Sequence, residues 1–375
     1  MEKQYRIGYY ILTDIQHIPP IMNIYGKLGG IILTKNHKIC DFIKKKYSDI
    51  ESDIYLVKNS SEARRKAIEY DLKIIIYTGF QMIFWGFAIQ IFHGTSDKKY
   101  VEDNRILLYD KVYLTGQKML DKIKNAGLYK FPEKFELIGY PKFDRIIKSR
   151  LSKTNHTEIT ILYAPTWISE NSGLKVNFSE YGESSLPLWG KKLIKAIAPQ
   201  WKLIIKYHSR VNKNAKGIYS EIRNFIKTND FEERVKIVWD ADISFYMEQA
   251  DIIITDISAV SYEWFHFDRP VIFANPSPGN YKPSLDKFSN TYAWNAGDVI
   301  TNENDIVPLI EKNLHKDEYN KNRTELLCYA FFKPDGNALN RQINSIKNLY
   351  SRIESYSKYY IIMRNLKKFL KSLVL

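Results

Sequence analysis

Short apolar runs alternate with polar segments of helical spacing along the first half of the chain. The runs at Tyr5–Leu12, Gly30–Thr34 and Lys73–Tyr77 are rich in β-branched residues and too short for helices, which favours buried strands. Segments such as His37–Lys46 have the spacing of a surface helix. This alternation is typical of an open, doubly wound sheet, so the pattern predicts an α/β fold with a first Rossmann-like domain over residues 1–150.

The alternation restarts after a polar and basic segment, Ser149–Thr157, which is the candidate interdomain linker. Apolar runs at Glu158–Ala164 and Trp201–Tyr207 again favour buried strands. The second half, residues 158–345, is therefore expected to form a second domain.

The clearest unit of the second half is the stretch Ala250–Ala274. Ile252–Ile254 predicts a buried strand, the segment from about 259 to 267 a helix, and Val271–Ala274 the next strand. Three side chains before the helix are expected to cap it: Thr255, Asp256 and Ser258. A helix N-terminus at the carboxyl edge of a sheet suits a phosphate. An ordinary β-α-β unit whose side chains only cap explains the pattern equally well.

Two places combine basic or imidazole groups with predicted strand ends. His93 follows the apolar run Ile89–Phe92 and precedes Gly94, which places it at the sheet edge where open α/β proteins bind ligands. A neutral imidazole accepts a hydroxyl proton near pH 7, so His93 is a candidate base, with a structural histidine as the alternative. Strand alternation puts Lys206 and His208 on one face, where both can reach one anion; a solvated lysine at the sheet edge is the alternative for Lys206.

The composition of the chain limits the classes of molecule that it is expected to bind. The net charge of +14 implies an anionic partner, either nucleic acid, an anionic lipid surface or a phosphate-bearing substrate. No RNA-binding aromatic motif, zinc finger or basic repeat occurs, so nucleic acid is not the expected partner. The chain has only two cysteines, which argues against a disulfide framework and suits a reducing cytoplasm. The sequence contains no Cys/His cluster with the spacing of metal ligands, so no metal site is expected. No signal peptide is apparent, and no run of 18 apolar residues predicts a membrane span.

The segment 350–375 predicts a basic amphipathic helix. Apolar residues fall at helical spacing on one side, and basic residues on the other: Arg364, Lys367, Lys368 and Lys371. Such a helix is typical of an interfacial anchor on anionic lipid. A terminal helix that packs back onto a domain is an equal alternative.

Several separated segments, in the right order, resemble motifs of the CDP-glycerol glycerophosphotransferases, which build teichoic acids and related capsule polymers. They are Phe92–Lys98 (W-H-G-T-P-x-K in the family), Gly139–Asp144 (G-Y-P-R-N-D), Ile161–Ile168 (I-L-Y-A-P-T-[WF]-R), Lys206–His208 (R-x-H), Thr255–Val260 with Glu263 and Arg269-Pro270 (T-D-Y-S-S-V…D/E…R-P), and Asp335–Arg341 (D-G-x-A/S…R). The chain departs from these motifs at Phe92, Ser96, Ile168, Ile257 and Ala259.

The resemblance implies a GT-B architecture, in which two Rossmann-like domains face across a cleft. The first would supply the base and the second would hold the donor. Catalytic roles fall on His93, as general base, and on His208. The donor-binding residues implied are Lys206, Thr255, Asp256, Ser258, Ala259 and Glu263. The residues implied in acceptor or phosphate contacts are Gly94, Thr95, Lys98 and Arg341. Basic groups would make a metal or cofactor unnecessary.

The resemblance also implies the reaction. Glycerol phosphate, or a related polyol phosphate, would pass from CDP-glycerol or another CDP-polyol to a hydroxyl of a lipid-linked saccharide or growing polymer, with release of CMP. The expected place is the cytoplasmic face of the bacterial membrane, with the C-terminal helix on the membrane surface. A GT-B glycosyltransferase that uses a nucleotide sugar is the alternative, because it would share the architecture.

Overall fold

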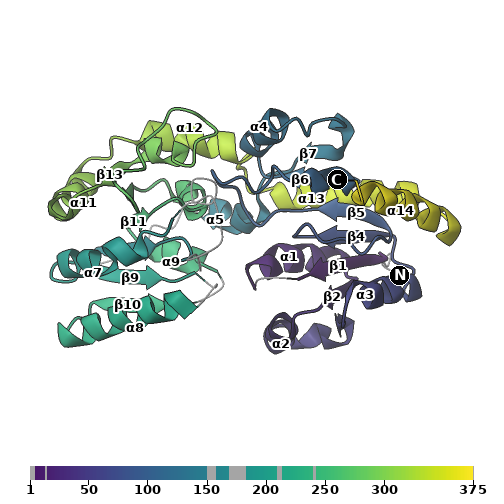
Figure 1. Cartoon of the computed structure of the whole chain (residues 1–375), viewed down its shortest axis with the longest axis horizontal. Helices are drawn as coiled ribbons and strands as arrows, with labels where there is room; N and C mark the ends of the chain where they lie inside the picture. Colours follow the sequence, from purple (N-terminus) through teal and green to yellow (C-terminus); the bar gives the residue numbers. More distant parts are fainter. Residues whose placement is uncertain are drawn as a thin grey trace. The chain divides into compact units, whose positions relative to one another are not determined.

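The computed structural model describes residues 5–12, 15–149, 158–168, 183–208, 213–239 and 242–374. It divides the chain into two compact units. The first comprises Met1–Thr95, Val101–Lys148 and Tyr329–Leu375, and the second comprises Ser96–Tyr100 and Ser149–Cys328. Each unit contains one parallel sheet with helices packed against it (Figure 1). Most of the linker expected at Ser149–Thr157 lies outside the described residues.

The first unit contains a seven-stranded parallel sheet in the order β3-β2-β1-β4-β5-β6-β7. Its strands are β1 (Ile7–Ile11), β2 (Ile31–Thr34), β3 (Ile54–Leu56), β4 (Ile74–Tyr77), β5 (Phe87–Gln90), β6 (Lys111–Leu114) and β7 (Phe135–Leu137). Its helices are α1 (Ile18–Leu28), α2 (His37–Lys46), α3 (Ser60–Glu69), α4 (Gln117–Asn125), α5 (Asp144–Ser149), α13 (Ala338–Ile353) and α14 (Lys358–Ser372). Every residue of β1, β2, β4 and β5 is buried, as expected of strands covered on both faces.

The second unit contains a six-stranded parallel sheet in the order β10-β9-β8-β11-β12-β13. Its strands are β8 (Thr160–Ala164), β9 (Lys202–Lys206), β10 (Val235–Val238), β11 (Ile252–Thr255), β12 (Val271–Ala274) and β13 (Asp298–Ile300). Its helices are α7 (Leu186–Ile197), α8 (Lys213–Thr228), α9 (Ser244–Gln249), α10 (Val260–Trp264) and α11 (Ile306–His315), and α12 (Asn320–Ala330) begins in it. Numbered within the unit, this is the doubly wound order 3-2-1-4-5-6, which confirms the predicted α/β class.

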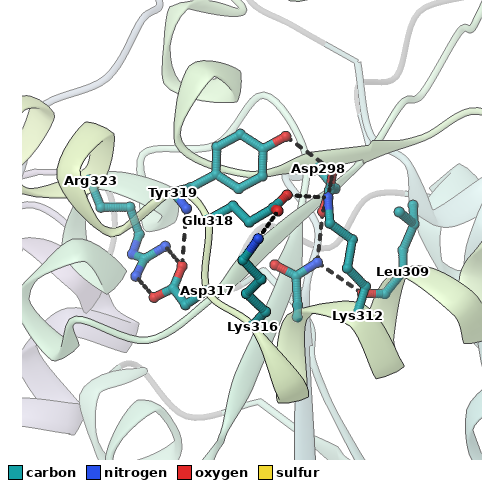
Figure 2. A network of polar contacts seen from close by, with 9 residues as sticks. Asp298, Leu309, Lys312, Lys316, Asp317, Glu318, Tyr319 and Arg323 are labelled. Atoms are coloured by element: carbon teal, nitrogen blue, oxygen red, sulfur yellow. Dashed lines mark hydrogen bonds and ion pairs between the residues drawn. The ribbon is translucent and has the colours of Figure 1, made fainter.

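A polar network fixes the helices that follow β13 (Figure 2). The carboxylate of Asp298 accepts hydrogen bonds from Lys312 and Asn313 of α11 and from the hydroxyl of Tyr319. The buried guanidinium of Arg323 pairs with Asp317. Since an unpaired buried cation is costly, these pairs specify how α11 and the start of α12 pack in the second unit.

The C-terminal part of the chain groups differently from the predicted ranges. The prediction placed residues up to 345 in the second domain, whereas the structure groups everything from Tyr329 onward with the first unit. The reason is the apolar face of α13, where Ile343, Ile346 and Tyr350 belong to the core that covers the first sheet. In Figure 1 the yellow helices α13 and α14 accordingly lie with the first unit.

The last helix, α14, docks onto the first unit through its basic side. Arg364 and Lys368 both pair with Asp110, whose carboxylate also accepts a hydrogen bond from the amide of Ala88 in β5. Burial raises the pKa of Asp110, but the charges of Lys368 and Arg364 outweigh burial and hold the pKa below its usual value. Burial lowers the pKa of Lys368 to about 8.

The opposite side of α14 carries exposed apolar side chains. Among the described residues, most of the exposed large hydrophobic side chains belong to this helix and the two residues after it: Tyr359, Tyr360, Ile362, Met363, Leu366, Phe369, Leu370, Leu373 and Val374. Packing back onto a domain, one of the two alternatives, is therefore observed. The docked side contains Arg364 and Lys368 together with the buried Ile361 and Asn365, and it leaves most of the apolar side chains uncovered.

Replacing Asp110, which pairs with Arg364 and Lys368, should release α14 from the first unit. Asp110→Ala leaves Arg364 and Lys368 without their buried counter-charge, which costs on the order of 3–5 kcal/mol unless the helix undocks. We expect faster hydrogen exchange in Lys358–Ser372, measured by mass spectrometry, with little change in the sheet. Asp41→Ala, at an exposed position of α2, is the control. Unchanged exchange in α14 would show that other contacts hold the helix.

Candidate functional site

Both sheets bring the sequence motifs to their carboxyl edges. All strand pairs are parallel, so the segments that follow the strands of one sheet emerge at one edge. The strand order reverses between β1 and β4 in the first sheet and between β8 and β11 in the second. In open α/β folds, the carboxyl end of the strands at such a switch point is the place where ligands bind. The candidate site residues are therefore described unit by unit, starting from these edges.

In the first unit, His93 lies in the loop after β5. The sequence predicted a strand that ends in His93, whereas β5 ends three residues earlier, at Gln90. The hydroxyl of Tyr140 donates a hydrogen bond of 2.6 Å to the backbone carbonyl of His93. Gly94, next in the chain, has φ of +143°, a conformation that residues with a Cβ rarely adopt. The backbone around His93 is thus held by a specific contact and a glycine turn.

Tyr140 belongs to a corner that joins two of the motif segments. A Cβ at Gly139, which has φ of +94°, would lie 2.8 Å from the carbonyl oxygen of Phe332. Arg341 donates to the carbonyl of Ile138, and its Nη1 donates to both carboxylate oxygens of Asp335. The guanidinium that was expected to contact acceptor or phosphate is thus engaged in holding the segment before α13.

The second unit has a buried carboxylate at its switch point. Asp256, directly after β11, is 1% exposed and accepts hydrogen bonds from the amides of Thr166 and Ser185 and from the hydroxyl of Ser185. Burial raises the pKa of Asp256 to about 6, while the Ser185 hydrogen bonds, the Lys98 charge and the Thr166 amide act against this rise. Asp256 therefore joins the end of β8 to the start of α7.

This geometry corrects the expected helix caps. The hydroxyl of Thr255 donates to the carbonyl of Ala164 in β8, and Asp256 bonds across the sheet, so neither caps the following helix. Ser258 does not cap it either, because Ala259 holds the N-cap position and no side chain caps the helix. The hydroxyl of Ser258 accepts a long bond from the amide of Val260, and its carbonyl accepts from the hydroxyl of Ser261, so Ser258 forms the turn before the helix. α10 spans Val260–Trp264 and continues as a 3-10 turn, Phe265–Phe267, so the helix predicted here is present. Ser258 and Ala259 lie directly before it, and Glu263 lies buried within it.

The segment after His93 contributes to the second unit. The structure assigns Ser96–Tyr100 to that unit, although Thr95 and Val101 belong to the first. The buried carboxylate of Asp97 accepts from the hydroxyl of Tyr262 in α10 and from the amide of Ala293. The ammonium of Lys98 donates to the hydroxyl of Thr166 at 2.8 Å and is close enough to act on the pKa of Asp256. A cation from the first motif is thus held at the switch point of the second sheet.

Lys206 and His208 lie at the next strand end. Lys206 is the last residue of β9, and its largely buried ammonium donates to the carbonyl of Tyr207 at 2.6 Å. His208 follows two residues later and is partly exposed. Because β9 pairs directly with β8, both residues lie on the same edge as Thr166.

Arg269, in the Arg-Pro segment of the resemblance, has a structural role. Its guanidinium donates to carbonyls at the C-terminal end of α9, those of Met247, Glu248 and Ala250. A cation at this position satisfies carbonyls that lack partners within the helix and complements the helix dipole.

Sequence reasoning missed several residues that build these edges. Asp97 stands at the variable position of its motif, so the resemblance gave no signal for it. Thr166 lies in a recognised motif, but nothing in the sequence links it to Asp256 or Lys98. Ser185 and Tyr262 contact their partners across long sequence separations, which periodicity does not report.

Two negative findings concern the described part of the chain alone. Within it, no group of three or more His, Cys, Asp or Glu side chains is arranged to hold a metal ion. No helix in the same residues combines the length and apolar character needed to cross a membrane.

Residues 45–348 match the family described as CDP-glycerol:poly(glycerophosphate) glycerophosphotransferase. The chain belongs to this family. It is similar to the teichoic acid poly(glycerol phosphate) polymerase of Bacillus spizizenii, at 25% identity over 279 residues, which covers 64% of this chain and 65% of the relative. It is also similar to the teichoic acid glycerol-phosphate primase of Bacillus subtilis, at 23% identity over 251 residues, 65% of this chain and 58% of the relative. The chain thus spans less than two thirds of these curated relatives.

Solved structures share the fold. The wall teichoic acid polymerase TagF superposes with a TM-score of 0.59 at 15% identity, over 93% of this chain and 90% of TagF. A UDP-N-acetylglucosamine 2-epimerase homologue from Listeria monocytogenes gives a TM-score of 0.57 at 12% identity, over 93% and 97% of the two chains. The predicted class, two Rossmann-like units of the GT-B type, is confirmed.

The buried carboxylate of Asp256 should make stability depend on pH. Because its folded pKa is raised, the protonated carboxyl stabilises the unit below about pH 4, and this contribution is lost as the pH rises through about 6. Relative to Asp256→Asn, which does not titrate, we expect the free energy of unfolding of the native chain to fall between pH 4.5 and 7.5, measured by urea denaturation.

Asp256→Ala provides the second arm of this test. It leaves the amides of Thr166 and Ser185 without the acceptor that Asp256 provides, at about 1–3 kcal/mol for each buried donor. We expect it to be less stable than Asp256→Asn at pH 5. Parallel pH curves for the native chain and Asp256→Asn would contradict the raised pKa.

Proposed function

We propose that the chain transfers glycerol phosphate, or a related polyol phosphate, from a CDP-polyol to a hydroxyl group and releases CMP. The observation that carries the proposal is the family match over residues 45–348, which includes every motif described above. The polymerase and the primase among the relatives both act in teichoic acid synthesis by name. A TagF structure obtained with CDPG supports a CDP-linked donor.

The reaction is a displacement at the phosphate that carries the polyol. The acceptor oxygen forms a new bond to this phosphorus while its proton passes to the imidazole of His93. The bond from phosphorus to the bridging oxygen of the pyrophosphate breaks, and CMP leaves with the electron pair. His93 suits the base because it lies at the carboxyl edge of the first sheet on a backbone fixed by Tyr140 and Gly94.

Cationic and amide groups of the second unit would stabilise the leaving CMP. Lys98, held by Thr166, carries positive charge to the switch point of the second sheet, and Lys206 and His208 lie at the adjoining strand end. Ser258, Ala259 and Glu263 remain proposed donor contacts, as do Gly94 and Thr95 for the acceptor. Asp256 and Thr255 would act indirectly, since their side chains hold the strand ends. Fixed charges aimed at the leaving group favour the transition state without a metal ion.

The proposal extends to the acceptor and to its location. We assign a lipid-linked saccharide or a growing polymer as acceptor, for teichoic acid or capsule synthesis at the cytoplasmic face of the membrane. The apolar face of α14 supports a membrane surface as partner, and the exposed lysines of the same helix, Lys358, Lys367 and Lys371, favour anionic lipid.

Donor turnover tests the reaction. With CDP-glycerol and a lipid-linked disaccharide acceptor, we expect CMP release, tested beside CDP-ribitol and UDP-sugars. His93→Ala should lower kcat by at least about 10²-fold, as expected of general base loss, with nearly unchanged nucleotide binding. Turnover with UDP-sugars alone would agree with the GT-B fold but would contradict the proposed reaction, and it would indicate glycosyl transfer instead.

The adjacent residues Lys98 and Lys99 provide a matched pair of substitutions that tests the proposed contact between Lys98 and the donor. Lys98→Ala should reduce kcat/KM for the CDP donor, because it removes the cation held beside Thr166. Lys99→Ala, at the next and exposed position, should have little effect. Equal effects of the two substitutions would contradict a specific role for Lys98.

Membrane binding tests the role of α14. The native chain should cosediment with vesicles that contain anionic phospholipid, and less with neutral vesicles or at high salt. Leu366→Glu/Leu370→Glu should abolish sedimentation, because it places charge on the exposed apolar face without touching the Asp110 cluster. Phe245→Glu/Leu285→Glu is the control, since it adds the same charge at exposed apolar positions of the second unit. Full binding by the α14 variant would exclude this face as the contact.

A further inference from the structure

His17 lies outside all the recognised motifs, yet its ring contacts the ring of His93. The two ring centroids are 4.4 Å apart, and the ring planes are inclined by 41°. His17 is buried, with 4% exposure, whereas His93 is partly exposed. An imidazole in van der Waals contact with the proposed base is therefore part of its immediate surroundings.

The fold fixes the place of His17. It ends the 3-10 turn Ile15–His17 and directly precedes α1, whose first turn contains Pro19 and Pro20. Proline restricts the backbone at the start of a helix, so this turn is stiff. The buried face of α1, with Ile18, Ile21 and Ile24, anchors it in the core of the first unit.

The sheet topology explains why the two histidines meet. His17 follows β1 and His93 follows β5, and only β4 lies between these strands in the sheet. Since all three strands are parallel, the segments after β1 and β5 emerge at the same edge. The contact therefore joins two segments that the switch point of the first sheet brings together.

We propose that His17 is a positioning residue for His93. The inference rests on the proposed role of His93 as the base. The backbone of His93 is already held by Tyr140, but the torsion that turns an imidazole ring is broad and only weakly restricted by itself. The ring of His17 restricts it, so that a nitrogen of His93 stays in hydrogen-bonding reach of the acceptor hydroxyl. His17 need not contact substrate.

Helix capping does not explain the position, because His17 precedes α1 without forming a side-chain cap hydrogen bond. A flat ring is what the contact requires, and a phenylalanine would supply one without an imidazole nitrogen. The two substitutions, to Phe and to Ala, therefore separate ring contact from loss of the side chain.

Steady-state kinetics with CDP-glycerol test the inference. His17→Ala should lower kcat about 10- to 100-fold, the effect expected when a catalytic group is misplaced, with KM for the donor and the Tm nearly unchanged. His17→Phe should restore most of kcat. His37→Ala, at an exposed position of α2 in the same unit, should behave like the native chain. Native kcat in His17→Ala, or equal loss in the Phe and Ala variants, would overturn the inference.

A double variant separates this inference from the proposed function. If His17 acts through His93, then His17→Ala/His93→Ala should be no slower than His93→Ala alone. A further loss in the double variant would show that His17 acts by another route. Native turnover in His93→Ala would instead overturn the role of the base itself, a result distinct from either outcome for His17.

Discussion

The buried carboxylate of Asp256 is the interaction on which the carboxyl edge of the second sheet depends. A carboxylate with 1% exposure is tolerated only if hydrogen-bond donors surround it, and here the donors come from the end of β8 and the start of α7. Thr166, held in this way, receives the ammonium of Lys98. The side chain of Asp256 thus holds together the ends of β8 and β11 and the start of α7, and it positions Thr166, which binds Lys98.

The motif residues divide into two kinds when their contacts are compared. Asp256, Arg269 and Arg341 have their polar atoms engaged in joining segments of the chain. Lys98 and Ser258 also form hydrogen bonds within the chain, but they lie with His93 at the carboxyl edges of the sheets, where open α/β folds bind ligands. A family resemblance does not distinguish these kinds, because a motif includes the residues that build a site together with those that react in it. The structure makes the distinction by showing which residues join distant segments of the chain and which lie at the sheet edges.

Local patterns predicted the local structure well. β-branched runs located β4, β11 and β12, since a buried parallel strand needs apolar residues on both faces. Long-range contacts were not predictable: Asp97 and Tyr262 are 165 positions apart, and neither has a periodic neighbour that signals the other. The grouping of α13 with the first unit was missed for the same reason, since an apolar helix face does not specify which core it joins.

The helix α14 shows where periodicity stops being informative. The pattern located two faces, but the structure turns Arg364 and Lys368 of the basic face inward, toward Asp110, and leaves most of the apolar side chains exposed. A buried ion pair contributes little net stability because desolvation offsets the attraction, whereas burying apolar area contributes about 25 cal/mol for each Å². A helix that needed only to dock would therefore gain more by the opposite orientation. The ion pairs with Asp110 instead specify the orientation that leaves these apolar side chains exposed, and this orientation supports the proposed contact with a membrane surface.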